Sequence, residues 1–172
     1  MKKRLLIMVV LVSLLFGCSS KTKDTINDNY RVFYQIFVGS FSDSNNDGIG
    51  DLRGIINRFD YLNDGNANSK KSLGVQGLWL SPIFISNSYH KYDVIDYYQI
   101  DPQFGTMDDL KELIELCHQR NVKLILDIPF NHTSSQHDWF RNFVAMHQSN
   151  NTSNIYYDFY TYVTKENKVN GR

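Results

Sequence analysis

The 172-residue sequence contains only two cysteines and three prolines, and its basic and acidic side chains balance at 18 each. Because there is no basic excess to hold a phosphate backbone, we expect no nucleic-acid partner. Two cysteines are too few for a disulfide framework. Hydrophobic residues make up 42% of the chain and charged residues 21%, which excludes wholesale disorder and predicts one globular domain with its own core.

The first residues have the pattern of an export signal. Three basic residues at positions 2–4 precede the stretch Leu5 to Phe16, which has one polar residue. This stretch is shorter than the roughly 20 residues of a membrane-spanning helix, so we predict a signal peptide over residues 1–17. The run that ends at Cys18 resembles a bacterial lipobox, in which the cysteine is lipidated. A plain signal peptide with a chance cysteine is the alternative.

The lipobox interpretation predicts a location and a domain plan. Cys18 would carry the lipid, residues 18–29 would form a polar tether, and residues 30–172 would form the folded part. We therefore expect a protein that is exported and anchored to the bacterial cell envelope through its lipid alone. The second cysteine, Cys117, lies on the apolar face of a predicted helix, so we expect a buried, inert thiol.

Hydrophobic periodicity predicts three strands separated by two helices. The strands are expected over Tyr30–Phe37, Val75–Leu80 and Lys123–Ile128. The first helix has its apolar repeat from Leu52 to Leu62, and the second is predicted to start at Thr106, capped with the help of Asp109. Three consecutive apolar residues, Leu124 to Leu126, favour a third strand that is buried on both faces.

The alternation of strand and helix predicts a parallel sheet with helices outside it, in an α/β fold. A doubly wound fold and a (β/α) barrel both fit this order. Residues 83–105 are expected to form a long aromatic-rich loop, and residues 129–172 show no clear period. Long polar loops follow the strands, which is the end that carries the chemistry in parallel α/β folds.

An acidic loop follows the first strand. Its oxygen-bearing residues are Asp43, Asn45, Asp47 and Asp51, at positions 1, 3, 5 and 9, and the carbonyl of Ile49 would be a further ligand. Gly48 allows the sharp turn that brings alternate side chains to one point, so the loop predicts a site for Ca²⁺, with Mg²⁺ also possible. It is no EF-hand, because Gly54 stands at position 12 and no helix precedes it. A polar turn with solvated carboxylates is the alternative.

Two further segments carry chemistry-bearing side chains. Residues 89–97 combine tyrosine, histidine and aspartate, which suits a sugar as well as a packed surface loop. The third predicted strand ends in Asp127-Ile128-Pro129-Phe130-Asn131-His132, where side chains are expected to face the active end of the sheet. A zinc site at His132 and His137 is not expected, because a spacing of five does not place both on one face and no other soft ligand lies near.

Together these segments resemble the α-amylase family of glycoside hydrolases, family 13. The matching segments, in order, are Tyr34–Phe37 with Phe41, Asp43–Asp51, Gly77–Pro82, Tyr89–Tyr97, Phe104–Thr106 and Asp127–His132. The similarity covers roughly residues 30–135. It implies the N-terminal portion of a TIM (β/α)8 barrel: its first three strands, two helices and the start of the loop domain after the third strand.

The resemblance also implies roles for individual residues. Tyr92 would stack on a sugar, with Asp93 beside it, and His132 would hydrogen-bond the same ring. Asp127 and Asn131 would hold the loop after the third strand or take part in a second metal site. The implied substrate is an α-glucan or maltooligosaccharide. Lys91 is a departure, because glycine is usual there, and it is expected to alter the loop or add a charge at its rim.

The catalytic carboxylates of the family have no counterpart in this sequence. A retaining enzyme needs a nucleophile and an acid about 5–5.5 Å apart, and the family's Gly-Phe-Arg-x-Asp context does not occur here. We therefore expect no catalytic residue in this chain, an incomplete barrel, and an N-terminal part of a longer enzyme that is inactive alone. The alternatives are a surface lipoprotein that binds glucan without cutting it and a calcium-binding surface protein.

Overall fold

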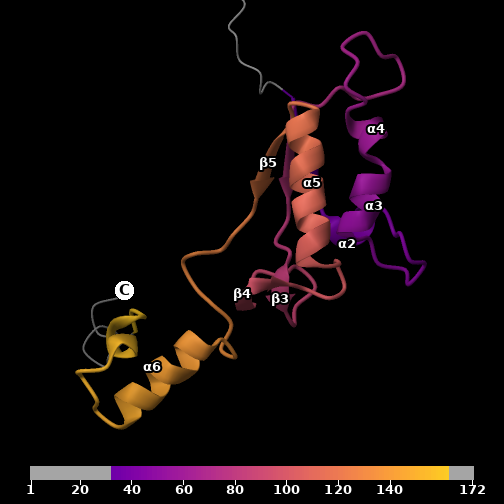
Figure 1. Cartoon of the computed structure of the whole chain (residues 1–172). Helices are drawn as coiled ribbons and strands as arrows, with labels where there is room; N and C mark the ends of the chain where they lie inside the picture. Colours follow the sequence, from indigo (N-terminus) through magenta and orange to yellow (C-terminus); the bar gives the residue numbers. More distant parts are fainter. Residues whose placement is uncertain (1–31, 163–172) are drawn as a thin grey trace, which may run out of the picture.

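A computed structural model describes residues 32–162 of the chain (Figure 1). The predicted signal peptide, the lipidation site Cys18 and the tether lie outside these residues. In chain order the elements are β1 (Phe33–Ile36), α2 (Val38–Phe41), α3 (Leu52–Asn57), α4 (Phe59–Leu62), β2 (Gly77–Leu80), β3 (Phe84–Ser86), β4 (Val94–Ile100), α5 (Met107–Gln119), β5 (Lys123–Leu126), α6 (Asp138–Gln148) and the 3-10 helix η1 (Ile155–Asp158). Within residues 32–162, no helix has the length and apolarity to cross a membrane.

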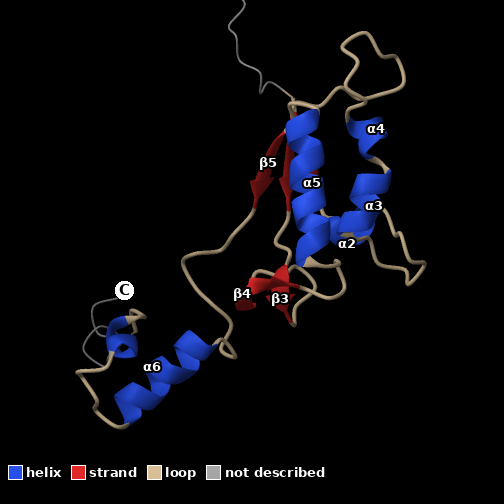
Figure 2. Ribbon diagram, viewed as in Figure 1, coloured by secondary structure: helices blue, strands red, loops and turns tan. Residues whose placement is uncertain are grey.

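The three predicted strands form one parallel sheet in the order β1-β2-β5, as expected from the alternation of strands and helices. Tyr34 is in register with Leu78, and Leu78 with Leu124. The face that carries these side chains packs against α3 and α5, which lie side by side over the strands (Figure 2). The core therefore lies between the sheet and this helix layer, as in one sector of a barrel wall.

The opposite face of the sheet is open to solvent, and here one prediction was wrong. Trp79 in β2 is 41% exposed and Ile125 in β5 is 45% exposed. The two are directly in register, so they form one exposed row. Leu124–Leu126 was expected to be buried on both faces. It is not, because no element within residues 32–162 covers this side of β5.

The first predicted helix is present as two short helices, α3 and α4, which meet at Arg58. Its predicted apolar repeat is correct, since Leu52, Ile55 and Leu62 have no exposed surface. Position 54 in α3 requires glycine, because the chain after α2 passes directly over it. A Cβ at this position would lie 1.8 Å from the carbonyl oxygen of Ser42.

The second predicted helix, α5, begins as expected. The Thr106 hydroxyl accepts from the Asp109 amide, and the Asp109 carboxylate accepts from the Thr106 amide, so both halves of a capping box are formed. Cys117 is 1% exposed, and burial raises the pKa of its thiol to about 12. The prediction of a buried thiol is confirmed, and the raised pKa makes this thiol a poor nucleophile.

Two segments without predicted structure contain regular elements. Residues 83–105 hold the antiparallel hairpin β3–β4, and residues 129–162 hold α6 and η1. The hairpin was missed because β3 has three residues and its pairing contains irregular register shifts. Helix α6 was missed although Phe140, Phe143 and His147 stand at helical spacing. Its contact with η1 joins residues from two elements, with His147 stacked on Tyr157 at 3.9 Å.

Candidate functional site

The candidate site lies where β1, β2 and β5 end, on the side of the sheet that meets the β3–β4 hairpin (Figure 1). Tyr92 leaves the loop between β3 and β4, and its phenol donates to the Oδ2 atom of Asp127 at 2.5 Å. The Nε2 atom of His132 lies 3.0 Å from the carbonyl oxygen of Tyr92. Three residues predicted from separate segments of the sequence are thus in direct contact.

Asn131 completes this group and indicates the tautomer of His132. Its amide nitrogen lies 2.8 Å from Nδ1 of His132. An amide nitrogen can only donate, so Nδ1 accepts and Nε2 carries the proton that is donated to the carbonyl of Tyr92. Asn131 and His132 are both exposed, and Tyr92 is 38% exposed. The group therefore presents a neutral imidazole and a phenol ring to solvent on a hydrogen-bonded frame.

The phenol of Tyr92 is kept protonated by its partner. The hydrogen bond to Asp127 raises the pKa of Tyr92 above its usual value, and the negative charge of that carboxylate acts in the same direction. Tyr92 therefore stays a neutral hydrogen-bond donor through the physiological range.

Asp93 does not join this group. Its Oδ1 atom accepts from the hydroxyl of Ser86 at 2.5 Å and from the hydroxyl of Ser88. Burial alone would raise the pKa of Asp93, but these two hydroxyl hydrogen bonds outweigh it and hold the pKa below the usual value. The carboxylate is thus ionised and bound within the hairpin, next to Tyr92 in sequence but turned to other partners.

The predicted metal loop is closed by its own backbone amides. The Asp43 carboxylate accepts from the amides of Asn45, Asn46 and Gly48, and the last of these, at 2.8 Å, does most to lower its pKa. Asp51 is 3% exposed and caps α3, since its Oδ1 accepts from the Gly54 amide at 2.6 Å and its Oδ2 accepts from Ser44.

Asn45 and Asp47 contact each other in the same loop, through a 3.1 Å hydrogen bond from the Asn45 amide to the Asp47 carboxylate. The donor set consists of oxygens, as a hard cation requires. Asp51, however, is already committed to the helix cap. Within residues 32–162, no three histidine, cysteine or acidic side chains are gathered as a metal site would gather them.

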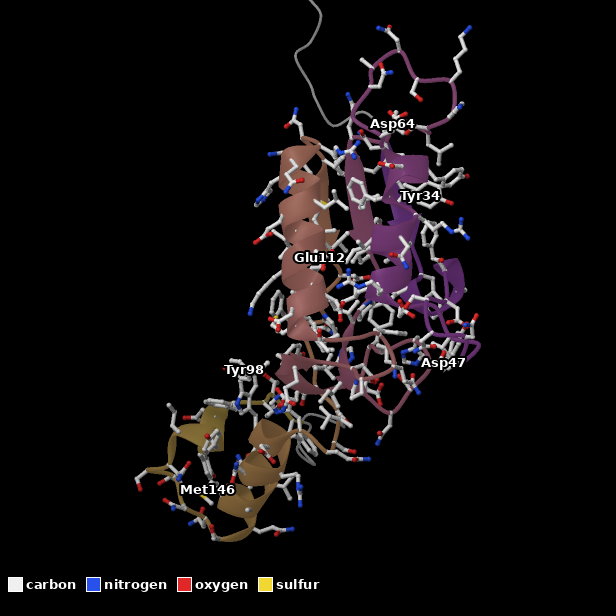
Figure 3. The ribbon with its side chains drawn as sticks, turned by 45° about the vertical axis from the view of Figure 1, so that its right-hand side comes forward. Tyr34, Asp47, Asp64, Tyr98, Glu112 and Met146 are labelled. Carbon is white, nitrogen blue, oxygen red and sulfur yellow. The ribbon has the colours of Figure 1, made fainter. Side chains whose placement is uncertain are left out.

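A pocket of about 650 Å³ opens beside Asn131 and His132. Its walls come from β3, β4, the segment after β5, α6 and the chain after η1: Phe84, Tyr97, Tyr98, Ile128, Phe130, Asn131, His132, Thr133, Trp139, Phe159, Tyr160 and Thr161. Figure 3 shows Tyr98 between the hairpin and the α6–η1 unit. The contribution of Trp139 and Phe159 was not predicted; the only signal was the density of aromatic residues after position 138.

Lys91 turns inward, which was not expected. The backbone at this residue is left-handed, with φ of 63°, and the residue is 5% exposed. Its Nζ atom lies 2.8 Å from Oδ2 of Asp101. The expectation of an added charge at the rim of the loop was therefore wrong, because the ammonium is used inside the hairpin.

Comparison with known proteins agrees with this geometry. The model of the alpha-amylase catalytic domain matches residues 35–172. The chain belongs to the alpha-amylase family. Alpha-amylase 3 of Dictyoglomus thermophilum is 45% identical over 139 residues, covering 81% of this chain and 25% of the relative. Oligo-1,6-glucosidase of Bacillus cereus is 46% identical over 130 residues, covering 75% of this chain and 21% of the relative.

A solved alpha-amylase structure from H. orenii matches with a TM-score of 0.70 and 50% identity, over 77% of this chain and 26% of the other. The fold is therefore that of a TIM-barrel alpha-amylase, of which the chain forms the N-terminal portion, and the alternative of a doubly wound sheet is excluded. The chain spans about a quarter of the length of these family members.

Proposed function

We propose that this chain is part of an exported glycoside hydrolase that acts on the α-glucosidic bonds of starch or maltooligosaccharides. The observation that carries the proposal is the hydrogen-bonded group of Tyr92, Asp127 and His132 at the carboxyl ends of parallel strands. That end of a TIM barrel is where catalytic and binding residues gather. The similarity to proteins named alpha-amylase and oligo-1,6-glucosidase supports the same class of substrate.

Each residue of the group would have a distinct task. The hydrogen bond from the Tyr92 hydroxyl to Asp127 fixes the ring of Tyr92. A face of this ring can then stack on the C–H side of a glucose ring. When a sugar binds, the Nε2–H group of His132 would donate its hydrogen bond to a sugar hydroxyl instead of to the carbonyl of Tyr92. Asn131 fixes the imidazole in the tautomer that makes this donation possible. Asp93 would bind a hydroxyl pair only after releasing Ser86 and Ser88.

The chain would recognise the sugar without cleaving it. The sequence contains three glutamates. Glu112 on α5 is bound to Arg53 of α3, Glu115 is exposed on α5, and Glu166 lies outside the described residues. Of the two described glutamates, neither follows a strand, since both lie within α5. We therefore expect the 172-residue chain to release no reducing sugar from soluble starch. Release above a buffer control would contradict the assignment of a binding role alone.

Calorimetric titration of the 172-residue chain with maltoheptaose tests sugar recognition. Tyr92→Ala is expected to weaken binding about tenfold, which corresponds to about 1.4 kcal/mol. Tyr61→Ala is the matched control, since Tyr61 is 50% exposed on α4, away from the carboxyl ends of the strands. If the folded wild-type chain showed no heat of maltoheptaose binding, the proposal would be wrong.

A second candidate is a surface lipoprotein that binds glucan without hydrolysis. It is favoured by the exposed ring of Tyr92, which is held by Asp127 and lies next to His132, because such a group can bind a sugar without a catalytic carboxylate. The DNA after codon 172 distinguishes the two candidates. A downstream segment with that context supports the hydrolase, whereas its absence from every frame supports the binding protein.

The acidic loop would hold a structural divalent cation, with Ca²⁺ favoured and Mg²⁺ also suited. Asp43, Asn45, Asp47 and the carbonyl of Ile49 would hold it. Asp51 would join them only by releasing a hydrogen bond from the Gly54 amide or from Ser44. When bound, the cation would neutralise the loop's negative charge and fix its shape. Asp127 and Asn131 fit a second metal less well, because they are already bound to Tyr92 and His132.

Lipidation at Cys18 would anchor the protein to the bacterial cell envelope. In the producing cell, the wild-type chain is expected in the membrane fraction and Cys18→Ser in the soluble exported fraction. Equal partition of both proteins would exclude a lipid anchor at Cys18.

A further inference from the structure

The residue that precedes Tyr92 carries two features that are unfavourable on their own. Lys91 has a left-handed backbone, which side chains other than glycine rarely adopt. Its side chain is 6% exposed, so a positive charge is removed from water. Such a combination persists only where the surroundings determine it, and it lies one residue before the candidate sugar-binding ring.

The surroundings of Lys91 satisfy its ammonium group completely. The Nζ atom donates to Oδ2 of Asp101 at 2.8 Å, to the carbonyl of Ser86 at 3.0 Å and to Oε1 of Gln103 at 3.3 Å. An ammonium has three protons, and three acceptors are present. The ring of Phe104 lies 5.5 Å from Nζ, within the range of a cation–π contact.

These partners lie at fixed points of the hairpin. Ser86 ends β3, and Asp101 follows β4 directly. Asp101 is itself fixed, since its Oδ1 accepts from the Gln103 amide at 3.0 Å. Lys91 belongs to the connection between β3 and β4, so its side chain ties that connection back to the body of the hairpin. Tyr92, the next residue, leaves this connection toward Asp127.

We propose that Lys91 is a positioning residue for Tyr92: its buried ion pair with Asp101 fixes the left-handed backbone that directs the Tyr92 ring to Asp127 and the Tyr92 carbonyl to His132. Lys91 does not touch a bound sugar in this arrangement. The inference rests on the proposed function only for its consequence in sugar binding, because the Tyr92–Asp127 contact exists without a sugar.

The test uses the 172-residue chain with ¹³Cζ-labelled tyrosine. The Tyr92 signal is identified by its loss in Tyr92→Phe, and its pH titration by NMR reports the hydrogen bond to Asp127. The decisive variant is Lys91→Met/Asp101→Asn, which removes both charges of the buried pair and leaves no lone carboxylate inside. We expect the pKa of Tyr92 to fall to about 10, the ordinary value of a phenol.

Two further variants separate charge from backbone conformation. Lys91→Gly keeps access to a left-handed backbone but loses the tether, and the Tyr92 titration is expected to shift as in the double variant. Lys111→Met is the matched control, because it also removes a lysine from an ion pair. The Lys111 side chain pairs with Asp108 on α5 and is 64% exposed. It is expected to leave the titration of Tyr92 unchanged.

Each outcome decides the proposal. A folded double variant whose Tyr92 titrates as in the wild type would overturn it. Loss of folding in the double variant, seen by circular dichroism, would also overturn it, since it would give Lys91 a purely structural role. Titration with maltoheptaose then separates the two proposals: if the wild type binds, the double variant should bind about tenfold more weakly. If the wild type does not bind, the proposed function fails while the Tyr92 titration still tests the positioning.

Discussion

Tyr92 lies in the connection between β3 and β4, Asp127 directly follows β5, and the phenol of Tyr92 donates to the carboxylate of Asp127 at 2.5 Å. The carboxylate raises the pKa of the phenol, both by accepting the hydrogen bond and by its negative charge. In Asp127→Asn the charge is absent, so the pKa of Tyr92 should fall toward about 10. Titration of ¹³Cζ-labelled tyrosine by NMR measures this change.

Asp93→Asn is the control for this experiment. Asp93 is the sequence neighbour of Tyr92, but its carboxylate is bound to Ser86 and Ser88. The same change of charge next to the same ring should therefore leave the Tyr92 titration as it is. An equal fall in both variants would mean that general charge, and not the hydrogen bond, sets the phenol pKa.

Calcium should stabilise the chain through the acidic loop. A ligand that binds only the folded state adds about 2.7 kcal/mol to the free energy of unfolding at 100 times its dissociation constant. We expect Ca²⁺ to raise the melting temperature of the wild-type chain and a chelator to reverse the rise. Asp47→Asn should remove most of the effect, because it takes one of the few negative charges in the exposed part of the loop.

Asp64→Asn is the matched control for the calcium experiment. Asp64 also lies in a polar loop and accepts a backbone amide two residues on, from Asn66 at 3.0 Å. Figure 3 shows the two residues well apart, with Asp64 near the top of the view and Asp47 at mid-height on its right-hand side. Asp64→Asn should keep the full calcium response. An equal loss in both variants would indicate binding through net charge instead of a defined site.

The parts of the fold that depend on local pattern could be predicted. The parallel strands, the apolar repeat of α3 and α4 and the capping box of α5 follow from side chains close in sequence. The hairpin β3–β4 could not be predicted, because its pairing joins Phe84 to Ile100 across an irregular register. The same holds for the exposure of Ile125, which depends on what covers the sheet and not on the strand's own residues.

The candidate site shows the same division. The resemblance to the α-amylase family implied that Tyr92 and His132 serve the same sugar, and the structure brings these two residues together with Asp127. The inward turn of Lys91 could not be predicted, because its partner Asp101 stands ten residues along the chain, after a strand that the sequence did not reveal.

His137 should make helix α6 sensitive to pH. Its Nδ1 accepts from the Trp139 amide at 3.0 Å and caps the helix, while Nε2 is buried without a hydrogen-bond partner. Burial lowers the pKa of His137 below 6.5, although Asp138 and Asp96 favour the charged form. The unfolded chain therefore takes up the proton first, and the stabilisation is complete above about pH 6.5 and is lost as pH falls through the folded-state pKa.

Urea unfolding at neutral and mildly acidic pH measures this effect. His137→Asn keeps a capping side chain that does not titrate, so its stability should change less between the two pH values than that of the wild type. His137→Ala should lose about 1 kcal/mol at neutral pH, because the cap is gone. His118→Asn, at an exposed position of α5, should retain the wild-type pH dependence. Identical pH profiles for wild type and His137→Asn would rule out this role.

Gly54 and Gly48 lie close in sequence but should respond differently to alanine. A Cβ at Gly54 would lie 1.8 Å from the Ser42 carbonyl oxygen and 2.6 Å from its carbonyl carbon, and backbone atoms cannot move aside without shifting the chain between α2 and α3. Gly54→Ala should therefore cost about 3 kcal/mol of unfolding free energy. At Gly48, φ is 88° and no atom lies within 4 Å of the added Cβ, so alanine meets backbone strain alone, about 1 kcal/mol. Urea unfolding of both variants measures the difference. If Gly48→Ala lowered the unfolding free energy more than Gly54→Ala, the close passage of Ser42 over α3 would not explain why glycine is needed at position 54.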